Sequence, residues 1–421
     1  MLSYFLFFFY LIFLSWSLTK IRFVVNAGLG NKIIVAIFIL KIIVGLVSAG
    51  IIQHNMNVDT WKYHFDALDE YHLLWIQPGR YFSNLFESAY TNGYAGFFGS
   101  AHSYWNDLKT NLVVKFISVL HVFSFGNYYV NVVLYNFLTF FGQIALFRVF
   151  LKIYKDHKRL LLITTFLLPS LLYYGSTIHK DGIIFFALGL MVFYVYQLLF
   201  ESGFKLKNVL LFLLAFLTVF LFRNYVCLIM IPALIALVIA IKTRVTPWVS
   251  FVAVFLISGI SFFMIPHFFP AINLPDLVVQ KQAEFLNLEK ANTNLQVTIL
   301  EPSFLSFLQN LPQAILNGFF RPLVTDYKYS NLLIPQIIEL VMYQLIILSF
   351  LIFKKQTNCF NNPFILFGLF IGISLCVFIG YSVPVIGAIV RYRAIYLPFI
   401  ITPFLCSIDF EKLKRSLFII K

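Results

Sequence analysis

The chain has 421 residues, of which 61% are hydrophobic and 11% charged, and its formal net charge is +14. A soluble protein of this length has no core large enough to bury that much apolar surface. Repeated apolar runs of about 17 to 25 residues instead predict an all-α, polytopic transmembrane bundle. We expect one integral-membrane domain over residues 1–421.

Eleven apolar runs fit membrane-spanning helices. They cover residues 2–18, 33–52, 127–151, 159–175, 181–200, 207–222, 224–241, 247–265, 332–353, 362–381 and 393–408. The first has no basic residue before it and no small-residue cleavage site after it, so we interpret it as a retained span. Residues 109–124 carry Lys109, Lys115 and His121 and predict an interfacial helix, with a twelfth span as the alternative.

The basic residues predict the orientation. With the N-terminus outside, the inner loops and tail hold 18 basic and 4 acidic residues, the outer segments hold 12 of each, and Lys41 and Glu339 lie within spans. This distribution follows the positive-inside rule, so the C-terminus is expected in the cytoplasm. The net charge therefore reports topology, and no nucleic-acid partner is expected.

Two long segments, 53–126 and 266–331, then lie outside. In the first, residues 55–72 (NMNVDTWKYHFDALDEYH) predict an interfacial helix over a site. One face of this helix holds Asp59, Tyr63, Asp66 and Glu70, and another holds Trp61, Phe65, Leu68 and His72. Residues 90–102 suggest an irregular or re-entrant loop. The second segment has a polar, helical middle at 280–294 and an amphipathic return ending at Arg321.

Cations gather at the outer ends of the predicted spans. Lys180, Arg223 and the Arg391/Arg393 pair are each expected at the N-terminus of a helix that enters the membrane from outside. Free N–H groups and the helix dipole favour anions there, and arginine matches phosphate oxygens. Together with Arg321, these residues predict a phosphate or pyrophosphate cradle at the outer leaflet.

An acid beside a phosphate cradle suggests glycosyl transfer from a lipid phosphate. The phosphate is a good leaving group that needs cations, whereas the acceptor hydroxyl needs a base. We expect Asp59, at the membrane boundary, to be that base. Further candidates for substrate contacts are Tyr63, His64, Asp181 and Glu339.

Each of these residues also has a structural interpretation. Asp59 can be a solvated residue at a helix N-terminus, and the turn His179-Lys180-Asp181 can be a cap with a local ion pair. The arginines can snorkel to lipid headgroups. Glu339 is costly to place in lipid, so it predicts either a site or a buried Lys or Arg partner, such as Lys41.

Cofactor signals are weak. The four cysteines, Cys227, Cys359, Cys376 and Cys406, have no metal-ligand or disulfide spacing, and there is no P-loop, dinucleotide fingerprint or nucleophile elbow. Asp66, Asp69 and His72 can meet on one helix, but one such cluster is weak evidence for a metal. We predict no cofactor and leave a metal site unknown.

Several short phrases carry a family resemblance. The acid opening the first outer loop resembles the GT-C class of polytopic glycosyltransferases. The phrases PSLLYYGSTIHKDG (169–182), FRNYV (222–226), FFRP (319–322) and IVRYR (389–393) resemble O-antigen or exopolysaccharide polymerase-like proteins of bacterial surface-polysaccharide clusters. In the GT-C class the acid usually follows the first span, whereas Asp59 follows the second apolar run. The resemblance implies a bacterial inner membrane with a periplasmic or extracellular active face, and it leaves a divalent cation possible.

We therefore expect a membrane glycosyltransferase of surface-glycan assembly. Its partners would be membrane lipid, a lipid-phosphate-linked glycan and an acceptor glycan or lipid. Transfer of a single sugar and polymerisation of oligosaccharide units both need the same outer-face groups. The alternative is a transporter or flippase of lipid-linked saccharide, which usually holds its substrate near the midplane on repeated halves.

Overall fold

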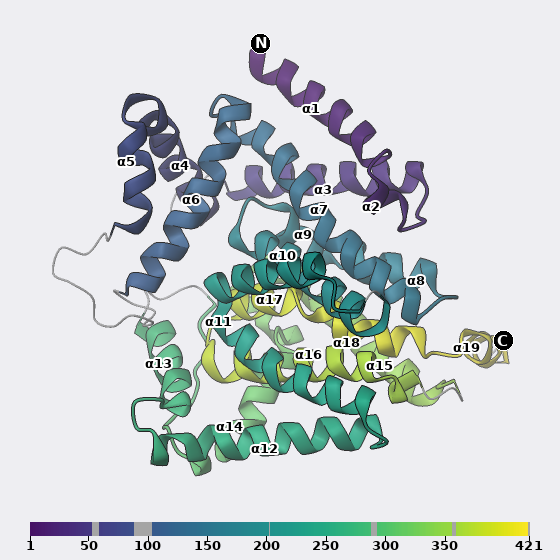
Figure 1. The fold of residues 1–421 in the computed structure, drawn as a ribbon. Helices are drawn as coiled ribbons and strands as arrows, with labels where there is room; N and C mark the ends of the chain where they lie inside the picture. The colour runs from purple at the N-terminus through teal and green to yellow at the C-terminus, as the bar shows by residue number, and fades with distance from the viewer. Residues whose placement is uncertain (53–58, 88–102, 202, 288–292, 356–358, 420–421) are drawn as a thin grey trace. The chain divides into compact units, whose positions relative to one another are not determined.

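The secondary structure of the described residues is helical and includes no β-strand (Figure 1). The computed structural model describes residues 1–52, 59–87, 103–201, 203–287, 293–355 and 359–419. The predicted loop at 90–102 lies outside these ranges. The helical architecture predicted from the apolar runs is confirmed for the rest.

Seven helices within these ranges are long and apolar enough to cross a membrane, and two bent helix pairs raise the number to nine. The pairs are residues 158–167 with 169–176, bent by 48°, and residues 386–394 with 397–406, bent by 64°. The eleven predicted spans differ from these nine in two places. Residues 2–18 form an apolar helix of 17 residues that is not among the nine, and α11 (Leu206–Lys242) is one helix where two spans are predicted. The count of eleven stays a prediction.

The chain folds into two compact units. Unit 1 holds Met1–Asp156, Thr165–Leu167 and Leu171–Asn224. Its helices are α1 (Leu2–Leu18), α2 (Arg22–Val25), α3 (Asn31–Ile52), α4 (Asp59–Ile76), α5 (Pro78–Ser83), α6 (Tyr104–Ser124), α7 (Tyr128–Ile153), most of α9 (Pro169–Ser176), α10 (Lys180–Tyr196) and the first half of α11.

Unit 1 is built around α7, the most buried of its candidate spans. Helix α10 packs so closely on α7 that a Cβ atom on Gly189 would collide with the backbone carbonyl of Gly142. Helices α4, α5 and α6 lie side by side (Figure 1). Helix α6 includes the ambiguous residues 109–124 and is not among the candidate spans, because polar residues interrupt its apolar face.

Unit 2 holds His157–Thr164, Leu168–Ser170 and Tyr225–Lys421. Its helices are α8 (Lys158–Leu162), the second half of α11, α12 (Pro247–Phe268), α13 (Leu274–Asn287), α14 (Phe304–Ile315), α15 (Ile334–Ile352), α16 (Pro363–Ser382), α17 (Ile386–Ala394), α18 (Leu397–Cys406) and α19 (Phe410–Ile419). Helix α16 is central to this unit and packs against α12, α13, α14, α17 and α18. At its tightest contact, a Cβ on Gly380 would collide with the carbonyl of Ala314 in α14.

The second long segment matches much of its prediction. Helix α13 covers the start of the polar stretch 280–294, of which residues 288–292 are not described. Helix α14 continues into a π-helical turn, η4 (Leu316–Phe320), and the amphipathic return ends at Arg321 as predicted.

The predicted position of the Arg391/Arg393 pair at a helix N-terminus is wrong. Both arginines lie in the last turn of α17, and the next helix begins only at Leu397. Pro398 explains the difference, because its ring has no N–H to donate and would clash with the carbonyl four residues earlier if α17 continued. The bend therefore falls after the two arginines, where the favourable N-terminal field is absent.

Candidate functional site

Four side chains from three parts of unit 1 form a continuous polar chain. His179 Nε2 lies 3.1 Å from Asp59 Oδ2, and His179 Nδ1 lies 2.8 Å from Asp181 Oδ2. The other carboxylate oxygen of Asp181 forms an ion pair with the Arg223 guanidinium. Exposure falls along this chain, because the Asp59 side chain is 46% exposed, that of His179 6%, that of Asp181 1% and that of Arg223 4%.

The start of α10 positions the middle of this chain. His179 is the extended N-cap residue (φ −155°, ψ 156°), Lys180 begins the helix, and Asp181 lies in its first turn. The first N–H groups and the helix dipole favour a carboxylate at that place. Lys180 is therefore at a helix N-terminus, as predicted. The helix dipole at this end stabilises the negative charge of Asp181.

His179 Nδ1 has two neighbours on the same residue. The backbone N–H of Asp181 donates to it at 3.3 Å, and the carboxylate oxygen Oδ2 lies 2.8 Å away in an ion-pair contact. His179 is the N-cap residue and its Nδ1 accepts this N–H, so in the neutral ring the proton is on Nε2, which faces Asp59.

Arg223 reaches the chain from a break in α11. Its backbone angles (φ −146°, ψ 75°) are not helical, and the helix continues on either side. A continuous helix of 37 residues would be about 56 Å long, almost twice the hydrocarbon thickness of a bilayer. The break lies where the sequence predicts a turn between two spans, and it turns the guanidinium toward Asp181.

The segment from Gly175 to His179 is held by side chains from two neighbouring helices. Three of its carbonyl oxygens accept hydrogen bonds from buried donors. The pairs are Lys41 Nζ with Gly175 O at 3.1 Å, Asn136 Nδ2 with Ser176 O at 2.8 Å, and Tyr135 Oη with His179 O. The hydroxyls of Ser48 and Thr177 are 2.8 Å apart. Donors from α3 and α7 thus fix the backbone that carries the imidazole.

Helix α4 brings Asp59 to His179 and is docked by buried aromatic residues. Trp61 stacks on Tyr128 with ring centroids 4.4 Å apart, and the Tyr63 ring lies 5.9 Å from the His179 ring. The predicted aromatic face of α4 is divided, because Trp61 is buried whereas Phe65 is exposed. The buried residues Thr60, Trp61, Tyr63, His64 and Ala67 form one face of α4, and Phe65 lies at the edge of that face.

Two further histidines join α4 to α6. The His64 and His121 rings are in edge contact with centroids 5.0 Å apart, and His121 Nδ1 lies 2.7 Å from the Asn131 amide. Burial, which disfavours the charged ring, lowers the pKa of each histidine to about 4, and His121 adds repulsion at His64. His64 is predicted from the sequence to contact substrate. In the structure it is 6% exposed, and its ring packs against His121 of α6.

The predicted acidic face of α4 is only partly directed at the site. Glu70 pairs with Lys115 of α6 at 2.5 Å and accepts a hydrogen bond from Asn84 at 2.7 Å. These contacts give Glu70 a structural role in holding α4 and α6 together. Asp59 is the acid of this face that contacts His179.

The remaining predicted residues lie in unit 2 and have their own partners. Arg321 pairs with Asp326, and the buried Arg393 donates to the Gly318 carbonyl at 3.1 Å. Arg391 is half-buried beside the ring of Tyr392. Their convergence with Asp59 on one phosphate stays a prediction.

Glu339 is buried in α15 and accepts several hydrogen bonds. Ser170 donates to it from its backbone N at 3.1 Å and from its hydroxyl at 2.9 Å, and the Tyr343 hydroxyl donates as well. Arg393 lies near enough to attract it electrostatically. Glu339 therefore caps the start of α9, while Lys41, its suggested partner, binds the Gly175 carbonyl.

The arrangement suits proton transfer at an exposed carboxylate. His179 Nε2 lies within hydrogen-bond distance of the Asp59 carboxylate, and the buried Asp181–Arg223 pair fixes the orientation of the His179 ring. The two ring nitrogens face different carboxylates, so the three groups do not converge on one point. Within the described ranges, no group of three His, Cys, Asp or Glu side chains is placed to hold a metal ion.

Sequence reasoning did not assign His179 to the site. The signal was present, since the polar triplet His179-Lys180-Asp181 interrupts two long apolar runs. The triplet fits a helix cap equally well, and only the approach of α4 and the break at Arg223 distinguish the two interpretations. Tyr135, which holds the His179 carbonyl, has no sequence signal because it is one of 23 tyrosines.

The fold and its long apolar helices define an all-helical integral membrane protein with a buried polar chain leading to an exposed aspartate. Comparisons with protein-family models, curated proteins and solved structures found no significant match.

Proposed function

We propose that unit 1 carries the acid–base site of a membrane glycosyltransferase that acts on a lipid-phosphate-linked sugar or oligosaccharide. The observation that carries the proposal is the contact of the exposed Asp59 carboxylate with His179, which the buried Asp181–Arg223 pair orients. A base that must meet a substrate hydroxyl needs both an accessible oxygen and a fixed direction.

The proposed reaction needs one proton acceptor. The acceptor hydroxyl attacks the anomeric carbon, the bond from this carbon to the phosphate oxygen breaks, and the lipid phosphate leaves with the electron pair. Asp59 takes the hydroxyl proton, and His179 stabilises the resulting carboxyl group and its position. Lys180, half-buried at the N-terminus of α10, is the cation of unit 1 that we assign to the phosphate.

The arrangement of Arg223 supports a different role from the one predicted from sequence. Its guanidinium is 4% exposed and paired with Asp181, so it orients the chain and does not meet the phosphate. Arg321 and Arg391, which are more accessible than Arg393, remain the proposed phosphate ligands of unit 2. Transfer of one sugar and polymerisation of oligosaccharide units stay open.

The test is complementation of a deletion strain of the native host with Asp59→Asn. Lipid-linked glycans and surface polysaccharide are compared on gels at equal membrane levels of the protein. We expect product to fall by about 10²- to 10⁴-fold, the usual contribution of a general base. Asp69→Asn, an exposed acid ten residues along the same helix, is the matched control and should leave product unchanged.

The remaining glycans distinguish the two enzyme classes. Single repeat units on the lipid indicate a lost polymerase, and a glycan lacking one sugar indicates a lost transferase. Full product from Asp59→Asn would show that Asp59 is not the base.

A further inference from the structure

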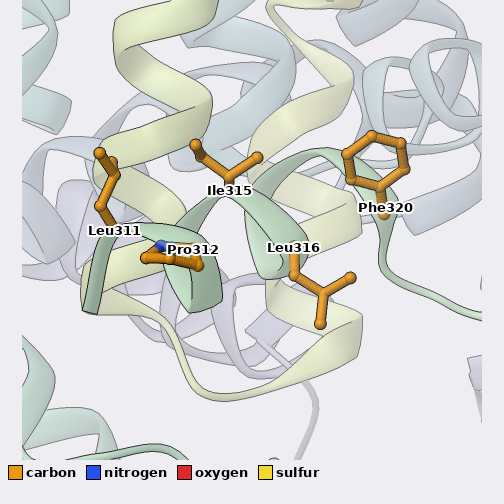
Figure 2. Close-up of a pocket in the computed structure, with 5 residues that line it drawn as sticks. All are labelled: Leu311, Pro312, Ile315, Leu316 and Phe320. Atoms are coloured by element: carbon orange, nitrogen blue, oxygen red, sulfur yellow. The ribbon is translucent and has the colours of Figure 1, made fainter. Parts of the chain in front are cut away.

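An apolar groove of about 380 Å³ runs along one helix of unit 2. It is lined by Leu311, Pro312, Ile315, Leu316 and Phe320, which come from α14 and the π-helical turn η4 (Figure 2). Every one of these side chains is hydrocarbon. The groove is therefore a surface that excludes polar groups and accepts an apolar chain.

The helix pattern explains why these residues line an open surface. Ala314, Asn317 and Gly318 lie on the other face of the helix and are buried. At Gly318 the backbone of this turn lies directly against the Cys376 carbonyl of α16. With that face held in the unit, the residues at 311, 312, 315, 316 and 320 project away from it.

The surroundings of the groove point to lipid. Three more residues of α14, namely Phe304, Leu305 and Leu308, are exposed and apolar, so the exposed face of the helix is mostly hydrocarbon, with Gln309 as its exposed polar residue. An exposed apolar face of this kind on a chain with several candidate spans belongs in a bilayer. A groove in that face holds a chain in one place, which a flat helix surface does not.

The residue that follows the last groove residue in the chain is a cation. Arg321 follows Phe320 directly, and its side chain is 19% exposed. One terminal nitrogen pairs with Asp326, and the buried Nε–H has no acceptor among the described residues, so the exposed part of the guanidinium is the part that can meet a phosphate. An apolar wall that ends at an arginine matches a lipid with a hydrocarbon chain and a phosphate.

We propose that this groove binds the hydrocarbon chain of a lipid phosphate, with the phosphate at Arg321. The inference rests on the proposed function, for which it names the residues that hold the lipid part of the substrate. It commits to the lipid phosphate and not to bulk membrane phospholipid or to a helix of a second copy.

The test uses the full-length protein in phospholipid nanodiscs with a polyprenyl phosphate that carries a photoreactive diazirine in its chain. Peptides labelled on irradiation are mapped by mass spectrometry. We expect labelling at residues 311–320 that unlabelled polyprenyl phosphate removes and that polyprenol without phosphate does not. Arg321→Gln should weaken this competition about tenfold or more, because a charge-assisted contact is lost.

Matched variants test the groove itself. Leu316→Trp fills it and should remove most of the labelling, whereas Leu308→Trp, on the exposed face outside the groove, should not. Asp59→Asn should label like the wild type, so a failure of the proposed chemistry and a failure of the groove are separable.

Two outcomes would overturn the proposal. Equal labelling of residues 304–308 and 311–320, competed by phosphatidylglycerol, would show bulk lipid only. Covalent dimers from a photoreactive amino acid at position 315 would show that a second copy covers the groove.

Discussion

The pair formed by Asp181 and Arg223 allows a sharp test of how buried the site is. Arg223→Met removes the cation and leaves the Asp181 carboxylate, 1% exposed, without its charge partner. Removing one member of a buried ion pair typically lowers stability by about 3–5 kcal/mol, because an uncompensated charge stays in a medium of low polarity. We therefore expect the free energy of unfolding to fall by about that amount.

The assay is denaturant unfolding of purified protein in mixed micelles, followed by tryptophan fluorescence. Lys152→Met is the matched control, since it removes the cation of a pair with Glu201 in the same unit whose side chains are 34% and 32% exposed. An exposed pair of this kind contributes about 1 kcal/mol or less. If Arg223→Met lowered stability no more than Lys152→Met, the inference that the pair is buried would be wrong.

Three further predictions follow from contacts in unit 1. Tyr135→Phe removes the hydroxyl that holds the His179 carbonyl, so kcat should fall about tenfold while the KM for donor stays unchanged. Gly189→Ala places a methyl group against the backbone of α7 and should lower stability by about 1–3 kcal/mol in the unfolding assay. The pKa values of His64 and His121 are lowered from 6.5 to about 4 in the folded protein. A state in which α4 has separated from α6 therefore binds more protons than the folded state as the pH falls below 6.5. The α4–α6 contact should therefore lose about 2 kcal/mol per ring by pH 5, measured as faster amide hydrogen exchange in α4, and His64→Phe should remove one ring's share.

Hydropathy predicts the helices well because a backbone in lipid must satisfy its hydrogen bonds internally, which a helix does. Apolar runs at residues 33–52 and 362–381 agree with α3 and α16 to within about two residues. It is less informative where proline or a polar residue interrupts a run. Pro398 moves the bend of the last span past Arg393, and the break at Arg223 sits inside a stretch that is helical on both sides.

The site is predicted only in part, since burial and partners are tertiary properties. Asp59, Asp181 and Arg223 stand out as charges beside apolar runs, and the structure brings all three together. Their link through His179 depends on α4 folding back over the start of α10, which no local pattern encodes. The same limit applies to Arg393, where sequence shows a cation but not that it is buried against the Gly318 carbonyl.

The stability cost of burying Asp181 and Arg223 can show whether this ion pair serves catalysis or only the fold. Replacing a buried ion pair by apolar residues of similar size is often neutral or stabilising, so stability alone does not explain Asp181 and Arg223. The double variant Asp181→Leu with Arg223→Met should therefore unfold within about 1 kcal/mol of the wild type, unlike Arg223→Met alone. Transfer should still fall about 100-fold, because His179 loses the carboxylate that fixes its ring and Asp59 loses its position. A double variant that kept wild-type transfer would show that the chain stabilises the fold and that Asp59 acts without it.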